Sequence, residues 1–232
     1  MENYMVKDFS EYGKNKNKVV QYFESINDAN LKHNKKLLGI IASEMVHDYV
    51  WSEDIAKIAL NLIYYFNGIK GEYDLNKSIA ITGTYGASKS MIMKIFQKYL
   101  QRISGGYGHP NIFRIVSIED VISVMAKENF FESELLFNYK TELDRPIRRP
   151  ANLLINEFGF KYNGKAYGTE YQELIEMFIM KRYDIYQDYG KLTHVTMNFD
   201  TEDLKNVFPE KIIDRFKEMF NLIPLNGISY RK

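Results

Sequence analysis

The most constraining feature of the sequence is the stretch from Ile79 to Phe96, which reads IAITGTYGASKSMIMKIF. A short apolar segment precedes a glycine-bearing loop, and a helical pattern begins at Lys89. This order matches the phosphate-loop pattern G-x-x-x-x-G-K-[ST] with one departure, because Ser88 stands where the pattern has glycine. Loop amides and the first turn of the following helix together favour a bound anion. The stretch therefore predicts a buried strand, a phosphate-binding loop and a helix, in that order.

Each position of this loop has an expected task. Gly83 permits a tight exit from the strand, and Gly86 lets the backbone approach a phosphate closely. Lys89 is expected to reach the β- and γ-phosphates of a nucleotide, and the Ser90 hydroxyl to bind Mg²⁺. The expected nucleotide contacts are Gly83, Tyr85, Gly86, Ala87, Ser88, Lys89, Ser90 and Met91. A strand–turn–helix that merely contains these residue types is the alternative.

The second chemical landmark is NLLINEFG, from Asn152 to Gly159. Its apolar residues form a short strand of the kind buried in a parallel sheet. Asn156 and Glu157 follow at the carboxyl end, where open α/β sheets bind their ligands. In a nucleotide hydrolase the first position helps to hold Mg²⁺ and the second polarises the attacking water. Because Asn156 brings no charge, we expect weakened magnesium binding and slow ATP hydrolysis. A polar turn is the alternative.

Short apolar strands alternate with helical patterns along the rest of the chain. Strands are expected near 79–82, 112–117, 152–156, 192–197 and 221–225. This alternation predicts an α/β protein whose five-stranded parallel sheet carries helices on both faces. Residues 1–50 are expected to form an N-terminal helical extension or a partner-binding segment, and residues 51–232 one domain.

Several residues are of the types that commonly begin helices. Ser52 is expected to cap a helix that ends near Gly68, Ser117 and Asp120 to form a capping box, and Thr169 to cap a long amphipathic helix. Pro209 is expected to open a final helix. The apolar face of the helix after Thr169 is expected to end at Lys181 and Arg182. His194 lies in mid-strand and is expected to be a packed core residue.

Composition excludes several classes of protein. The formal net charge is +1, which argues against coating nucleic acid by bulk electrostatics. There are no cysteines, so disulfides and cysteine-ligated zinc are excluded. Hydrophobic residues make up 45% of the chain, enough for a sizeable core, yet no apolar run reaches membrane-spanning length. The sequence predicts a cytoplasmic protein with no membrane contact.

The order of these motifs resembles that of AAA+ ATPases, and most closely the DnaC/IstB-type helicase-loader and transposition-helper family. The resemblance covers about residues 52–232. It is most specific in THVTMNFDTEDLKN and in KIIDRFKEMFNLIPLNGISYR. It implies a P-loop fold that binds ATP and Mg²⁺, with Ser90 and Asn156 at the metal. The family's full C-terminal lid is not expected here.

The resemblance also assigns roles to single residues. Glu157 matches the water-activating acid and Asn198 the first sensor, although Asn198 also fits a helix cap before Thr201. Arg215 matches the arginine offered to a neighbouring subunit's nucleotide, which implies self-association. Arg231 matches the second-sensor arginine.

Three functions remain open at this point. The first is an ATPase switch in DNA replication or mobile-element maintenance that contacts a replicative helicase, a transposase or single-stranded DNA. A basic groove for DNA would draw on Arg145, Arg148, Arg149, Tyr162 and Lys181. The second is a weakly hydrolysing adaptor that works through protein contacts. The third, a phosphoryl-transfer kinase, has no acceptor-pocket signature to favour it.

Overall fold

The computed structural model describes residues 28–84, 86, 88–106, 108–126, 150–158, 164–166, 169–198 and 201–225. The chain forms two compact units. The first comprises Met1–Asn76 and Ile95–Ile112, and the second Lys77–Lys94 and Phe113–Lys232. The domain boundary expected near residue 50 stays a prediction.

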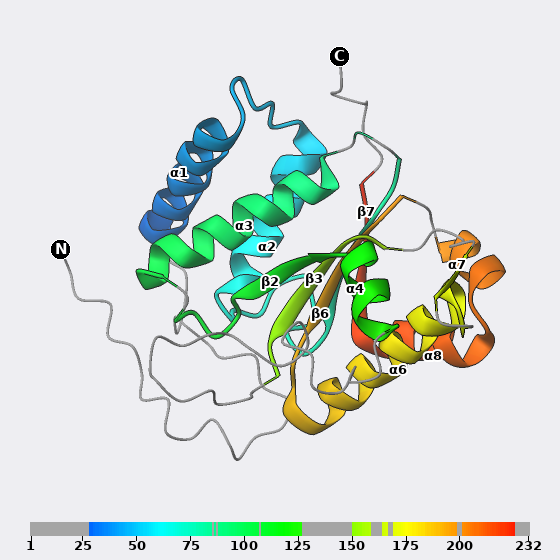
Figure 1. The fold of residues 1–232 in the computed structure, drawn as a ribbon. Helices are drawn as coiled ribbons and strands as arrows, with labels where there is room; N and C mark the ends of the chain where they lie inside the picture. The colour runs from blue at the N-terminus through cyan, green and yellow to red at the C-terminus, as the bar shows by residue number, and fades with distance from the viewer. Residues whose placement is uncertain are drawn as a thin grey trace. The chain divides into compact units, whose positions relative to one another are not determined.

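The first unit is built from helices (Figure 1). It contains α1 (Asp28–Met45), α2 (Glu53–Phe66) and the part of α3 (Lys89–Ser104) from Ile95 onward. The Ser52 side chain accepts a hydrogen bond from the Ile55 backbone N–H at 3.3 Å, which confirms the expected cap of α2. Phe66 stacks on Phe96 with ring centroids 5.3 Å apart, and both side chains are fully buried. The core of this unit therefore contains a stacked aromatic pair among mainly aliphatic side chains.

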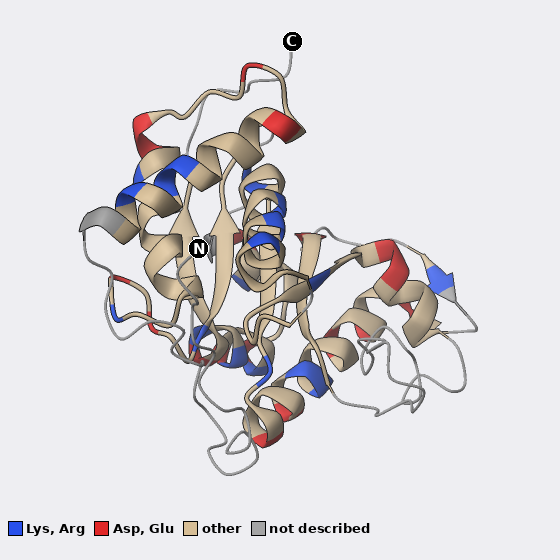
Figure 2. Cartoon of the chain, turned by 90° about the vertical axis from the view of Figure 1, so that its left-hand side faces the viewer, with Lys and Arg blue, Asp and Glu red and all other residues tan. Residues whose placement is uncertain are grey.

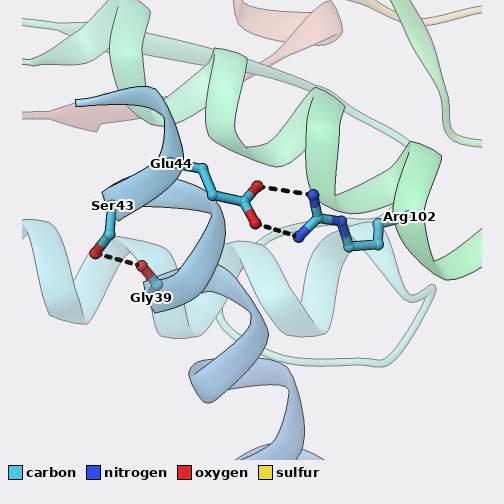
Figure 3. A network of polar contacts seen from close by, with 4 residues as sticks. All are labelled: Gly39, Ser43, Glu44 and Arg102. Atoms are coloured by element: carbon cyan, nitrogen blue, oxygen red, sulfur yellow. Dashed lines mark hydrogen bonds and ion pairs between the residues drawn. The ribbon is translucent and has the colours of Figure 1, made fainter. Parts of the chain in front are cut away.

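A bidentate ion pair joins α1 to α3 within the same unit (Figure 3). The Arg102 guanidinium donates to the two carboxylate oxygens of Glu44 at 3.1 and 2.7 Å. These hydrogen bonds lower the pKa of Glu44. On the residue before Glu44, the Ser43 hydroxyl donates to the Gly39 carbonyl, one turn earlier, at 3.0 Å. Because both charged groups are exposed, the pair adds little to stability.

The second unit contains a five-stranded parallel sheet (Figure 1). Its strands are β1 (Ser78–Thr82), β2 (Phe113–Ser117), β3 (Asn152–Phe158), β6 (Thr193–Met197) and β7 (Phe220–Pro224). Their spatial order is β2-β3-β6-β1-β7, and every neighbouring pair is parallel. This confirms the expected α/β class and all five strands. Residues of β1 and β6 are buried throughout, as central strands require.

Within the described residues, this unit also contains the start of α3, up to Lys94, and the helices α4 (Ile118–Met125), α6 (Tyr171–Tyr189), α7 (Thr201–Val207) and α8 (Glu210–Met219). The capping box of α4 is confirmed, because Asp120 N–H donates to the Ser117 hydroxyl at 3.1 Å and Ser117 N–H to the Asp120 carboxylate at 3.0 Å. Pro209 is the N-cap of α8. The helix starts were therefore well marked in the sequence, with one exception.

The exception is Thr169, which does not cap α6. It lies in β5 (Thr169–Glu170), which pairs with β4 (Lys165–Ala166) in a small antiparallel ribbon. Glu170 is the N-cap instead and makes no side-chain cap bond. Thr169 precedes the N-cap by one residue, and it cannot cap the helix because it pairs with Ala166 in the ribbon.

The expected end of the apolar face at Lys181 and Arg182 is also wrong. Helix α6 continues to Tyr189, and Arg182 is 0% exposed. Its Nε donates to the Thr193 hydroxyl at 2.7 Å, and one terminal nitrogen to the carbonyls of Ala151 and Leu192, both at 3.0 Å. Burial lowers the pKa of Arg182 to about 9. The guanidinium thus ties α6 to the starts of β3 and β6.

His194 is a core residue, as expected. It is 0% exposed, and its Nδ1 accepts a hydrogen bond from the Ile79 backbone N–H at 3.0 Å. Its ring packs edge-on against Phe113, with centroids 5.1 Å apart. Burial, assisted by the charge of Arg182, lowers the pKa of His194 to about 3.

Candidate nucleotide-binding site

The loop after β1 has positive φ angles at three of its described residues. Gly83, Gly86 and Ser88 have φ angles of 135°, 81° and 62°. Glycine adopts such angles freely, whereas a side chain makes them costly by about 1 kcal/mol. The phosphate-loop pattern has glycine at position 88 because the backbone there has a positive φ. Ser88 adopts the same conformation, at a cost in conformational free energy. Tyr85 and Ala87 lie outside the described residues.

Lys89 is the first residue of α3 and is only 5% exposed. Its ammonium donates to the carbonyls of Gly83 at 2.9 Å and Thr84 at 2.5 Å. The side chain thus reaches back across the loop and holds a positive charge there. Ser90 and Met91 follow in the first turn of α3 and are half-buried. A buried cation beside a helix N-terminus is an arrangement that suits phosphate.

Asn156 and Glu157 lie on a β-bulge at the carboxyl end of β3. Ile155 pairs with Val195 and Phe158 with Met197, so three steps along β3 match two along β6. Glu157 takes up the extra residue with a φ of 58°, and its side chain is exposed. Bulges re-aim side chains, and strained backbone gathers at functional sites. The strand was expected to end at residue 156 but continues to Phe158 through this bulge.

An aromatic cluster anchors the strand directly after the bulge. The Phe158 ring is 5.7 Å from Phe208 and 5.5 Å from Phe216, centroid to centroid. Phe216 in turn stacks on Phe220 at 4.6 Å. With Ile155 and Phe158 both 1% exposed, the bulge is held between two buried residues. Its shape is therefore set by packing.

Thr196 of β6 links the two motifs and was missed in the sequence. Its hydroxyl donates to Oδ1 of Asn156 at 3.0 Å and accepts from the Glu157 backbone N–H at 3.1 Å. It also lies 3.5 Å from the Ser90 hydroxyl. Thr196 is 1% exposed and is paired with Ile81 of β1. A threonine one residue before the end of β6, two residues before Asn198, was the available signal.

The remaining site residues lie on other elements. Asn198 follows β6 directly and is half-buried. Arg215 lies on α8 and was expected to point outward, but its guanidinium stacks on the Tyr183 ring of α6 at 4.3 Å from the centroid. The Tyr183 hydroxyl donates to Glu218 at 2.8 Å, which holds the ring in place. Thus Ser90, Asn156 and Glu157 come together around Thr196, whereas Arg215 makes its contact on α6. Arg231 lies outside the described residues.

Most residues of the expected basic groove lie in parts of the chain that the structure does not describe. Arg145, Arg148, Arg149 and Tyr162 lie outside the described residues, and Lys181 is half-buried on α6. Basic and acidic segments are interspersed along the helices in Figure 2, in keeping with the net charge of +1. Within the described part of the chain, no helix combines the length and apolar character needed to cross a bilayer.

Comparison with solved structures identifies the fold. No protein-family model matches the sequence, and no curated protein matches it either. A crystal structure of the DnaC helicase loader is similar to this chain with a TM-score of 0.53 and 16% identity, over 77% of this chain and 93% of that one. A crystal structure of DnaI is similar with a TM-score of 0.50 and 13% identity, over 85% and 93%. The chain therefore has the fold of these structures, a five-stranded parallel sheet with helices, which confirms the fold that the resemblance implied.

Proposed function

We propose that the protein binds ATP and acts as a helicase-loader-like AAA+ switch in DNA replication or mobile-element maintenance. The observation that carries this proposal is the buried Lys89 ammonium at the start of α3, held across a loop with three positive φ angles. A positive charge at that place fits the triphosphate of a nucleotide.

The residues present also fit a magnesium ion. Ser90 would hold the ion, and the loop from Gly83 to Met91 would hold the phosphates. When bound, Mg²⁺ neutralises charge on the β- and γ-phosphates. Glu157, exposed at the bulge, would orient and activate the attacking water, and Asn198 would bind the γ-phosphate or that water. We expect slow turnover because of Ser88 and Asn156.

Partners follow from the same proposal. Arg215 would reach the nucleotide of a neighbouring subunit, so ATP would promote self-association. The similar DnaC structure is that of a helicase loader, which makes a replicative helicase the first partner to test. A transposase and single-stranded DNA are the next partners to test, and residues 1–50 are the proposed partner-binding segment. Arg231 is proposed as the second-sensor arginine.

A weakly hydrolysing adaptor is the second candidate. The specific observation in its favour is that the Thr196 hydroxyl already engages the Asn156 amide oxygen. Such a protein would bind ATP without appreciable turnover and act through contacts alone.

Lys89→Ala tests the proposed ATP binding. We expect calorimetry to show a loss of most ATP affinity without unfolding, because the ammonium faces the loop. Lys94→Ala is the matched control, since Lys94 is an exposed lysine on the same helix. Equal ATP affinity in wild type and Lys89→Ala would mean that the loop is a structural turn only. Turnover with and without single-stranded DNA separates the switch from the adaptor.

A further inference from the structure

We propose that Thr196 is a positioning residue that holds the amide oxygen of Asn156, so that Asn156 offers N–H donors to the nucleotide and ATP binds with little help from Mg²⁺. This inference rests on the proposed ATP binding and deepens it. It names the residue that sets how strongly the site depends on the metal.

The direction of the hydrogen bonds follows from counting donors. The Glu157 backbone N–H can only donate, so the Thr196 oxygen accepts that bond at 3.1 Å. The single hydroxyl hydrogen must then find another acceptor. Oδ1 of Asn156 lies at 3.0 Å, whereas the Ser90 oxygen lies at 3.5 Å, which is long for a bond between hydroxyls. The hydroxyl hydrogen therefore goes to Asn156.

The opposite orientation of the Asn156 amide is less favourable. It would direct N–H donors at a Thr196 oxygen that already accepts from Glu157. The hydroxyl hydrogen would then have only the long contact to Ser90. Thr196 thus fixes the orientation of the Asn156 amide.

This orientation decides what Asn156 can do for a ligand. Among the residues that the structure describes, Asn156 makes no second side-chain hydrogen bond. Its Oδ1 is already engaged by Thr196 and carries no charge, which makes it a poor Mg²⁺ ligand, and its NH₂ group donates and does not bind that ion. An N–H donor suits a phosphate oxygen directly. An aspartate here would also accept the Thr196 hydrogen, yet would keep a negative oxygen for the metal.

The surrounding structure makes this arrangement rigid. Glu157 N–H is placed by the bulge, and the bulge is anchored by Ile155 and Phe158, both 1% exposed. Thr196 sits in a central strand with β3 on one side and β1 on the other. Its hydroxyl is therefore preorganised in the ligand-free fold.

The test measures ATP affinity by calorimetry in excess EDTA and in excess Mg²⁺, and takes the ratio of the two Kd values. For wild type we expect a ratio below about threefold, and for Asn156→Asp a ratio of about tenfold or more, equivalent to about 1.4 kcal/mol. Thr196→Val keeps the side-chain shape but frees the amide to turn its oxygen to the metal, so the ratio should rise several-fold. Thr196→Ser keeps the hydroxyl and should restore the wild-type ratio.

Thr193→Val is the matched control, because Thr193 is another buried threonine of β6 whose hydroxyl bonds Arg182 instead. It should lower the thermal midpoint while leaving the ratio unchanged. A wild-type ratio as large as that of Asn156→Asp would overturn the proposal, and so would a ratio that Thr196→Val leaves unchanged. Should Thr196→Val fail to fold, Thr196→Ala takes its place, because it also removes the hydroxyl that holds the Asn156 amide. Absence of ATP binding in both buffers would instead refute the proposed function itself.

Discussion

Acidification should destabilise the second unit through the buried imidazole of His194. Its Nδ1 accepts the Ile79 N–H, so the neutral ring carries its proton on Nε2. Protonation of Nδ1 would set two donors against each other in a place without solvent. Burial, followed by the charge of Arg182, accordingly lowers the pKa of His194 from 6.5 to about 3.

The sign and size of the effect follow from proton linkage. The unfolded chain binds a proton at His194 below pH 6.5, and the folded chain does so only near pH 3. The contribution to stability is therefore complete above pH 6.5 and is lost as the pH falls toward 3. At 1.36 kcal/mol per pKa unit, the free energy of unfolding should fall by about 2 kcal/mol between pH 6.5 and pH 5.

His194→Asn isolates this contribution, because Asn keeps an acceptor for the Ile79 N–H and does not titrate. Urea unfolding at several pH values should show a less stable variant at pH 7.5, owing to lost packing, with a flatter pH profile below 6.5. His33→Asn, at an exposed position of α1, controls for loss of an imidazole from the surface. If wild type and His194→Asn lose stability in parallel from pH 6.5 to 5, the buried neutral imidazole is not the cause.

Three further predictions concern the nucleotide site. Ser88→Gly should stabilise the protein by about 1 kcal/mol and tighten ATP binding, because it relieves a φ of 62°, as thermal unfolding and calorimetry would show. Asn156→Asp should raise ATP turnover several-fold, which corresponds to a barrier lower by about 1 kcal/mol, whereas Glu157→Gln should abolish turnover. If Asn156→Asp leaves turnover unchanged while Glu157→Gln abolishes it, the amide of Asn156 is sufficient for hydrolysis. Arg215→Ala should preserve ATP binding but remove any turnover that rises with protein concentration, and an unaffected concentration dependence would count against a role between subunits.

The sequence predicted the parts of the fold that depend on local pattern. All five strands and the caps at Ser52 and Ser117 could be identified because apolar runs and cap residues leave a signature within a few positions. Thr169 was misassigned because a two-residue ribbon, a tertiary feature, took it into a strand. Arg182 was read as the end of an apolar face, although its burial depends on carbonyls contributed by two distant strands.

The roles of the candidate nucleotide-site residues stay predictions, and the geometry that joins these residues was not predicted. The loop, Asn156 and Glu157 were found from spacing, because phosphate-loop chemistry constrains consecutive positions. The bulge at Glu157 and the hydroxyl of Thr196 were not found. Both depend on the register between β3 and β6, which a single sequence does not encode as a periodic pattern.

The strand order has a consequence for how the chain acquires its nucleotide loop. β1 lies between β6 and β7, so its two partners are residues 193–197 and 220–224, both synthesised more than a hundred residues later. Until they arrive, the strand that leads into the loop has no neighbour on either edge. Such non-local pairing slows folding. In a nascent chain both edges of β1 would be unpaired, and the apolar side chains of Ile79 and Ile81 would be exposed. The proposed ATP binding should therefore become possible only late in synthesis, once β7 has docked beside β1.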